Sequence, residues 1–60
     1  MTKGDVVSIY KNWYTETNLE GEAVLLEKME EDDVSEEWVV RFKGDSDKDV
    51  ISRRILKPKN

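Results

Sequence analysis

Apolar and polar residues alternate most regularly in residues 37–43, the segment EWVVRFK. The apolar side chains at every second position are Trp38, Val40 and Phe42. Successive side chains of a strand point to opposite faces of a sheet, so this pattern predicts a strand with one buried and one largely solvated face. A shorter β-branched and aromatic run at residues 6–10 predicts another strand.

Residues 22–29 suit two structures, because Ala, Leu, Glu, Lys and Met all favour helices. In a helix, one face would carry Ala23, Leu26 and Met29. Against a helix, Gly21 stands at the start of the run, and the acidic residues 30–33 would lie at the negative end of the helix dipole. We predict a strand here. The alternative is an α+β fold in which a helix near residues 22–32 packs on a small antiparallel sheet.

The last third of the chain predicts two short strands, residues 49–52 and 55–57, joined by a tight turn at Arg53 and Arg54. Pro58 then ends the pairing because it has no N–H to donate. The predicted connections are rich in turn-forming residues and comprise residues 11–20, 30–36 and 44–48. Five short strands in 60 residues predict one all-β domain over residues 1–60. Closure of the sheet into a small barrel would remove its exposed edges.

The composition excludes much chemistry, because the chain has neither cysteine nor histidine. Disulfides, the commonest general base and the usual zinc ligands are therefore absent. Residues 45–49, DSDKD, resemble the start of a calcium-binding loop, but Val50 and Leu56 stand where such a loop needs Gly and Glu. With no phosphate-binding loop and no nucleophile motif, we expect a protein that is not an enzyme and that has no cofactor and no metal.

The chain is acidic, with a net charge of −4, and no stretch is apolar enough to cross a membrane. Its first residues lack the apolar core of a signal peptide. We therefore expect a cytoplasmic, monomeric protein without membrane contact.

The order of these predicted strands resembles the SH3-like small β-barrels, especially their KOW and Tudor-like branches. The matching segments are GDVV at residues 4–7, GEAV at 21–24, WVVRF at 38–42 and RRILKP at 53–58. The resemblance implies a five-stranded SH3-like barrel that binds peptides, methylated side chains, RNA or the protein surface of a larger assembly. It also implies an origin among the small proteins of bacteria and their phages. The Ala-Leu-Tyr-Asp-Tyr signature of proline-binding SH3 domains is absent.

Three aromatic residues, Tyr10, Trp13 and Tyr14, lie in or beside the first predicted loop. In an SH3-like barrel this loop borders the ligand groove, where exposed rings stack on a peptide, a base or a methylated cation. The other interpretation of Trp13 is a cap on a small core. The candidate ligand-binding surface joins the aromatic residues to an acidic tract that contains Glu31, Asp32 and Asp33. The leading hypothesis is thus a small non-catalytic protein-binding module, an adaptor or regulator whose partner protein is unidentified.

Two other functions stay open. Arg41, Arg53 and Arg54 form the basic component of a KOW-like nucleic-acid contact, whose affinity would fall steeply with salt. The competing interpretation of these arginines is cross-strand pairing with the many carboxylates. The remaining alternative is a structural component of a larger assembly.

Overall fold

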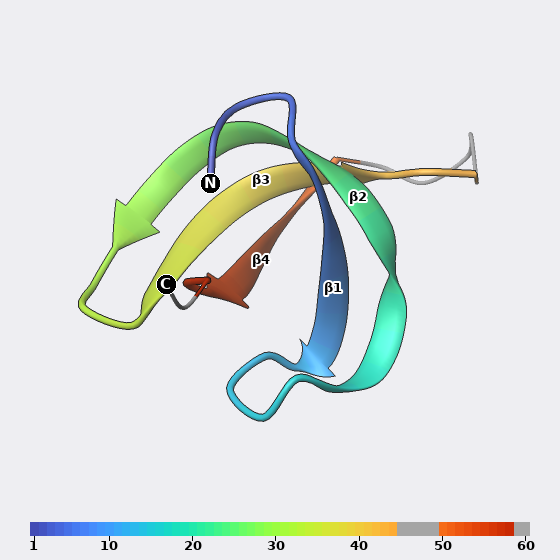
Figure 1. Cartoon of the computed structure of the whole chain (residues 1–60). Helices are drawn as coiled ribbons and strands as arrows, with labels where there is room; N and C mark the ends of the chain where they lie inside the picture. The colour runs from blue at the N-terminus through green and yellow to red at the C-terminus, as the bar shows by residue number, and fades with distance from the viewer. Residues whose placement is uncertain (45–49, 59–60) are drawn as a thin grey trace.

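The computed structural model describes residues 1–44 and 50–58 and forms one curled antiparallel sheet (Figure 1). Its strands are β1 (Val6–Asn12), β2 (Thr17–Glu31), β3 (Ser35–Phe42) and β4 (Ile51–Leu56). Each strand pairs with its neighbour in the sequence, in the order β1-β2-β3-β4. The described residues contain no helix, so the all-β prediction is confirmed and the helix near residues 22–32 is wrong. Accordingly, those residues include no helix able to span a membrane.

Strand β2 explains why the sequence also suited a helix. Its first half pairs with β1 and its second half with β3. Two register shifts along β3 leave Leu26 and Met29 as extra residues on β2. Each bulge adds one residue and bends the strand. An extended backbone with bulges at these positions therefore accommodates apolar residues that are spaced by three in the sequence. Ala23 is fully buried, Leu26 is half-buried and Met29 is exposed.

Strand β4 differs from the prediction, because Arg53 and Arg54 do not form a turn. They lie in the middle of one continuous strand, where Arg53 pairs in register with Trp38 and Arg54 with Glu37. Instead of the two short strands predicted at residues 49–52 and 55–57, residues 51–56 form a single strand; residue 49 lies outside the described residues. The described sheet has four strands and is not closed, so a five-stranded barrel is not confirmed. Its edge strands, β1 and β4, nevertheless approach each other.

The first connection is much shorter than the predicted loop at residues 11–20. Most of those residues belong to β1 and β2, and only residues 13–16 form the turn between them. The Glu16 N–H donates to the Asn12 carbonyl at 2.8 Å, and the Asn12 side-chain amide donates to Thr17 Oγ1 at 3.2 Å. Glu16 has a positive φ of 57°, which helps to reverse the chain within four residues. The result is a compact hairpin end that carries Trp13 and Tyr14.

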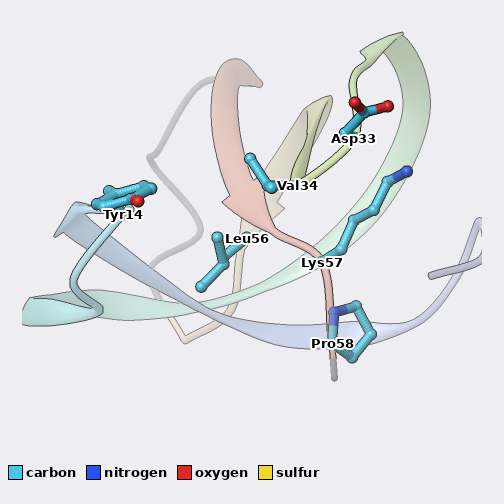
Figure 2. A pocket seen from close by; sticks show the side chains of 6 residues that line it. All are labelled: Tyr14, Asp33, Val34, Leu56, Lys57 and Pro58. Atoms are coloured by element: carbon cyan, nitrogen blue, oxygen red, sulfur yellow. The ribbon is translucent and has the colours of Figure 1, made fainter. Parts of the chain in front are cut away.

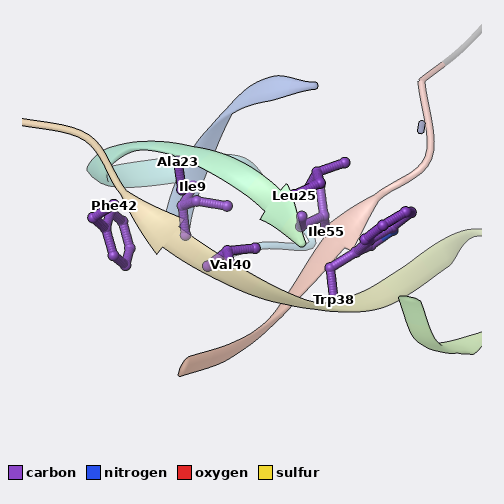
Figure 3. Close-up of a cluster of buried hydrophobic side chains, with 7 residues drawn as sticks. All are labelled: Ile9, Ala23, Leu25, Trp38, Val40, Phe42 and Ile55. Atoms are coloured by element: carbon purple, nitrogen blue, oxygen red, sulfur yellow. The ribbon is translucent and has the colours of Figure 1, made fainter. Parts of the chain in front are cut away.

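The hydrophobic core lies on the concave face of the curled sheet (Figure 3). Its buried residues are Ile9, Ala23, Leu25, Trp38, Val40, Phe42 and Ile55. The prediction that one face of residues 37–43 is buried is confirmed. The Trp38 indole N–H donates to Glu36 Oε1 at 2.7 Å, so the polar atom of this buried ring is satisfied. Residues 45–49, which include the calcium-loop resemblance and most of a predicted turn, lie outside the described residues.

Candidate functional site

The turn between β1 and β2 presents two aromatic rings in different ways. Trp13 is half-buried, whereas Tyr14 is 68% exposed. The two rings meet edge to face, with their centroids 5.5 Å apart and their planes at 88°. The Arg54 guanidinium lies over the Trp13 ring, 5.8 Å from its centroid. Trp13 is thus outside the buried core cluster and is fixed by two neighbours at the surface.

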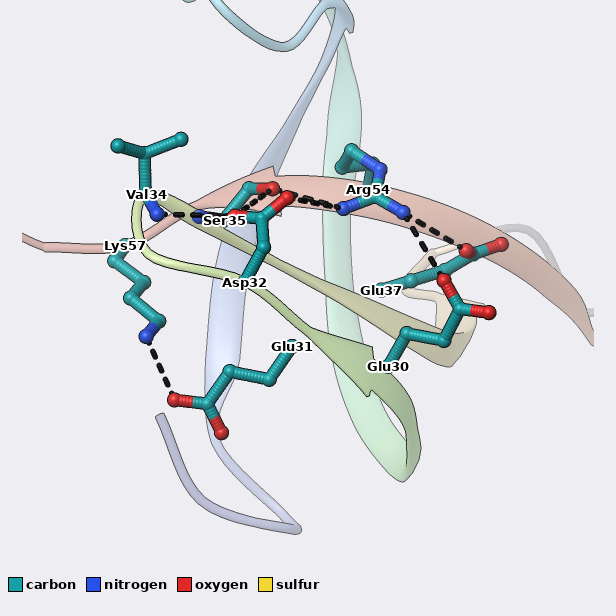
Figure 4. A network of polar contacts seen from close by, with 8 residues as sticks. All are labelled: Glu30, Glu31, Asp32, Val34, Ser35, Glu37, Arg54 and Lys57. Atoms are coloured by element: carbon teal, nitrogen blue, oxygen red, sulfur yellow. Dashed lines mark hydrogen bonds and ion pairs between the residues drawn. The ribbon is translucent and has the colours of Figure 1, made fainter.

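Arg54 joins this aromatic turn to the acidic turn between β2 and β3. Figure 4 shows its contacts on the side of the acidic turn. Its guanidinium contacts Ser35 Oγ at 2.8 Å, Asp32 Oδ2 and Glu37 Oε1 at 3.3 Å, and Glu30 Oε1 at 3.5 Å. One side chain of β4 therefore binds the acidic turn and supports Trp13 at the same time. Arg54 is thus a direct physical link between the acidic turn and the aromatic turn.

Asp32 organises the acidic turn from within. Its Oδ1 accepts hydrogen bonds from the Val34 N–H at 2.9 Å, the Ser35 N–H at 2.7 Å and the Ser35 hydroxyl at 3.0 Å. These bonds, those from the backbone first, hold the pKa of Asp32 below its ordinary value because they stabilise the carboxylate. The turn predicted at residues 30–36 is confirmed only at residues 32–34, because residues 30 and 31 belong to β2 and residues 35 and 36 to β3. Asp32 is one of the structural residues of this shorter turn.

Glu31 is likewise paired inside the chain. Its carboxylate lies 2.8 Å from Lys28 Nζ and 2.6 Å from Lys57 Nζ. The hydrogen bond from Lys28, followed by that from Lys57, lowers the pKa of Glu31 to about 2. Glu31 therefore ties the end of β2 to the residue that follows β4.

A groove lies between the aromatic turn, the acidic turn and the end of β4 (Figure 2). We call it the Tyr14 groove; its volume is about 490 Å³, and it is lined by Tyr14, Asp33, Val34, Leu56, Lys57 and Pro58. The Lys57 N–H donates to the Val34 carbonyl at 2.8 Å, which fixes one wall. The structure thus brings together Tyr14 and Asp33, two residues of the predicted surface that are far apart in the sequence.

The apolar lining of the Tyr14 groove was not among the predicted site residues. Val34 is 49% exposed in an otherwise polar turn, and Leu56 and Pro58 come from the end of the chain. The one signal in the sequence was a valine placed among acidic and hydroxyl residues. The other predicted residues of the surface do not line this groove; they are Tyr10, Trp13, Glu31 and Asp32.

Two further hollows surround Trp13. The first, which we call the middle hollow because it shares lining residues with the Tyr14 groove and with the other hollow, measures about 450 Å³. It is lined by Lys11, Asn12, Trp13, Tyr14 and Thr15. The second, which we call the Lys11 hollow, measures about 410 Å³ and is lined by Tyr10, Lys11, Trp13, Glu20, Arg53 and Arg54. Arg53 donates from Nε and Nη2 to the two carboxylate oxygens of Glu20, at 2.9 and 2.8 Å. Two of the three predicted nucleic-acid residues therefore meet here, whereas Arg41 is exposed on β3 and does not line this hollow.

No protein family, curated protein or solved structure matches this chain. The candidate site is therefore defined by its own geometry: an apolar groove, two hollows around a fixed tryptophan, and a set of ion pairs that joins them.

Proposed function

We propose that the chain is a small non-catalytic protein-binding module, an adaptor or regulator, that holds an extended peptide segment of its partner in the Tyr14 groove. The observation that carries the proposal is the groove itself. Its volume of about 490 Å³ lies within the roughly 300–1,000 Å³ of ligand sites. It combines an exposed tyrosine ring with the apolar side chains of Val34, Leu56 and Pro58, and aromatic residues are enriched at protein interfaces.

Charge in the groove favours a particular kind of peptide. Lys57 is neutralised by Glu31 at 2.6 Å. Asp33, by contrast, has no ion-pair partner within residues 1–44 and 50–58. A ligand with an aliphatic side chain next to a lysine or arginine fits this arrangement, because the aliphatic group packs on Tyr14 while the cation pairs with Asp33.

The same ion pairs weigh against the nucleic-acid alternative. Glu20 binds Arg53 through both carboxylate oxygens, and three carboxylates surround Arg54. The positive charges of Arg53 and Arg54 are therefore already compensated within the chain, and the chain as a whole carries a net charge of −4. Phosphate binding depends on uncompensated cations, so these pairs support a protein partner over nucleic acid.

We also propose kinship with the SH3-like small barrels. A single antiparallel meander that curls until its edge strands approach each other supports this relation. The four described strands form an open sheet. Closure of this sheet into a five-stranded barrel is part of the proposal.

The test is selection from a display library of short random peptides on the immobilised protein. We expect enrichment of peptides with Lys or Arg beside an aliphatic residue, and calorimetry on a synthesised example should show D33N weakening its binding about tenfold. The matched control is E22Q, which removes the same charge from an exposed position on β2 outside the groove. Absence of enrichment, or equal affinities of D33N and E22Q, contradicts the proposal.

A further inference from the structure

The three hollows around the aromatic turn follow one another along the surface. The Tyr14 groove and the middle hollow share Tyr14. The middle hollow and the Lys11 hollow share Lys11 and Trp13. A peptide that leaves the Tyr14 groove along this path therefore passes Trp13 and reaches the Lys11 hollow next.

The charge of the Lys11 hollow is opposite to that of the Tyr14 groove. Arg53 is held by Glu20 through two hydrogen bonds, and Arg54 by the acidic turn. Lys11 is exposed, and in the described part of the chain it has no ion-pair partner. Its ammonium is thus the uncompensated charge of this hollow, as the Asp33 carboxylate is that of the groove.

The walls of the Lys11 hollow are preorganised. Tyr10 and Trp13 are both half-buried, and Trp13 is held by Arg54 over one face and by an edge-to-face contact with the Tyr14 ring. A ligand group that enters here meets aromatic walls that need no reordering, which lowers the entropic cost of binding. The ammonium of Lys11 at the wall supplies a charge-assisted hydrogen bond.

We propose that the Lys11 hollow is a second subsite of the same surface and receives the carboxylate of an acidic residue in the bound peptide. The inference rests on the proposed function and adds the polarity of the ligand: a basic residue at Asp33, an aliphatic residue at Tyr14, and an acidic residue beyond Trp13 at Lys11. A single carboxylate suits this hollow better than a chain of phosphates. Glu20 already occupies part of its wall, and the carboxylates around Arg54 repel further negative charge.

The experiment uses one synthetic peptide from the selection and two relatives, in which either its acidic or its basic residue is replaced by glutamine. With the unchanged peptide, K11Q should lose about tenfold in affinity and the control K3Q, an exposed lysine outside the hollow, should lose none. With the peptide that lacks the acidic residue, K11Q should bind as well as the unaltered protein. D33N should weaken the binding of the unchanged peptide and of the peptide without its acidic residue by the same factor.

Amide and indole NMR signals give an independent readout. Binding of the unchanged peptide should shift the Lys11 amide and the Trp13 indole N–H. The Trp38 indole N–H, which is buried and bonded to Glu36, should stay in place and serves as an internal control. The peptide without its acidic residue should leave the Lys11 signal unmoved.

The outcomes separate the two proposals. Selected peptides without an acidic preference, together with equal affinities of K11Q and K3Q, overturn the second subsite and leave the Tyr14 groove standing. Failure to select any peptide overturns both. If a short oligothymidine shifts the Lys11 and Trp13 signals and the acidic peptide does not, the hollow binds nucleic acid and the inference is wrong.

Discussion

The two tryptophans have the same side chain and opposite surroundings. Trp38 lies near the middle of β3, is 3% exposed, and donates its indole N–H to the buried Glu36. Trp13 lies in a four-residue turn, is half-buried, and contacts Arg54 and Tyr14. Position in the hairpins decides the difference, because the strand faces the concave core while the turn extends beyond it. Trp38 therefore stabilises the fold, and Trp13 shapes a surface.

Replacement of Trp38 by alanine should have the largest effect on stability. A buried tryptophan reduced to alanine costs about 3–5 kcal/mol. A domain of 60 residues has a free energy of unfolding of roughly 3–9 kcal/mol, so W38A should lose at least about a third of it and should unfold if the value is at the lower end of that range. Circular dichroism during urea and thermal unfolding measures this. A midpoint close to that of the unaltered protein would remove Trp38 from the core.

Replacement of Trp13 by alanine should have a small effect on stability and a large effect on peptide binding. The ring is half-buried already, so W13A should lose no more than about 1.5 kcal/mol of stability. Its affinity for the selected peptide should fall more than tenfold, as for an aromatic residue at the centre of an interface. W13F, which keeps a ring, should retain part of that affinity. If W13A unfolds as W38A does, Trp13 belongs to the core and the contrast between the two residues disappears.

The sequence predicted the surroundings of Trp38 well, because they follow from local alternation. The surroundings of β2 were harder to predict. Its bulges at Leu26 and Met29 place apolar residues three apart, a spacing that also fits a helix. The pairing of β2 with β3 decides between strand and helix, and a short window of sequence does not contain both strands.

The candidate site was predicted only in part, for a similar reason. Two adjacent arginines suggested a turn, yet each is stabilised in β4 by a carboxylate distant in the sequence, Glu20 for Arg53 and Asp32 for Arg54. Tyr14 and Asp33 were predicted to share a surface, and they line one groove. The apolar wall from Val34 and Pro58 depends on how the end of β4 meets the acidic turn, which is a tertiary contact.

Replacement of Arg54 by methionine should loosen Trp13 without disturbing Trp38. Methionine keeps much of the apolar stem and removes the guanidinium that contacts Trp13 and the acidic turn. We expect the free energy of unfolding to fall by about 1 kcal/mol or less, because each of the lost contacts is weak. The Trp13 indole signal should shift and the Trp38 signal should not. R41M, an exposed arginine on β3, is the matched control and should change stability by less than about 0.5 kcal/mol.

Acid should give the smallest effect and should act first on the side of the molecule that holds Trp13. The pKa values of Glu31 and Asp32 are lowered in the folded chain, Glu31 to about 2 by its hydrogen bonds to Lys28 and Lys57. Because a lowered pKa means that folding favours the carboxylate, their contribution is complete above the ordinary carboxyl pKa, 4.5 for Glu31, and disappears as the pH falls towards 2.

Thermal unfolding from pH 6 to pH 2 should therefore show an acid decline that is shallower in E31Q, which has no proton to gain at this position. In the same titration, protonation of Asp32 should weaken its contact with Arg54 and shift the Trp13 indole signal. The Trp38 indole N–H donates to Glu36 on β3, outside this turn, and should keep its signal until the whole chain unfolds. If both indole signals move together from the start, the acidic turn and the core form one cooperative unit, and Trp13 is no more separable from the fold than Trp38.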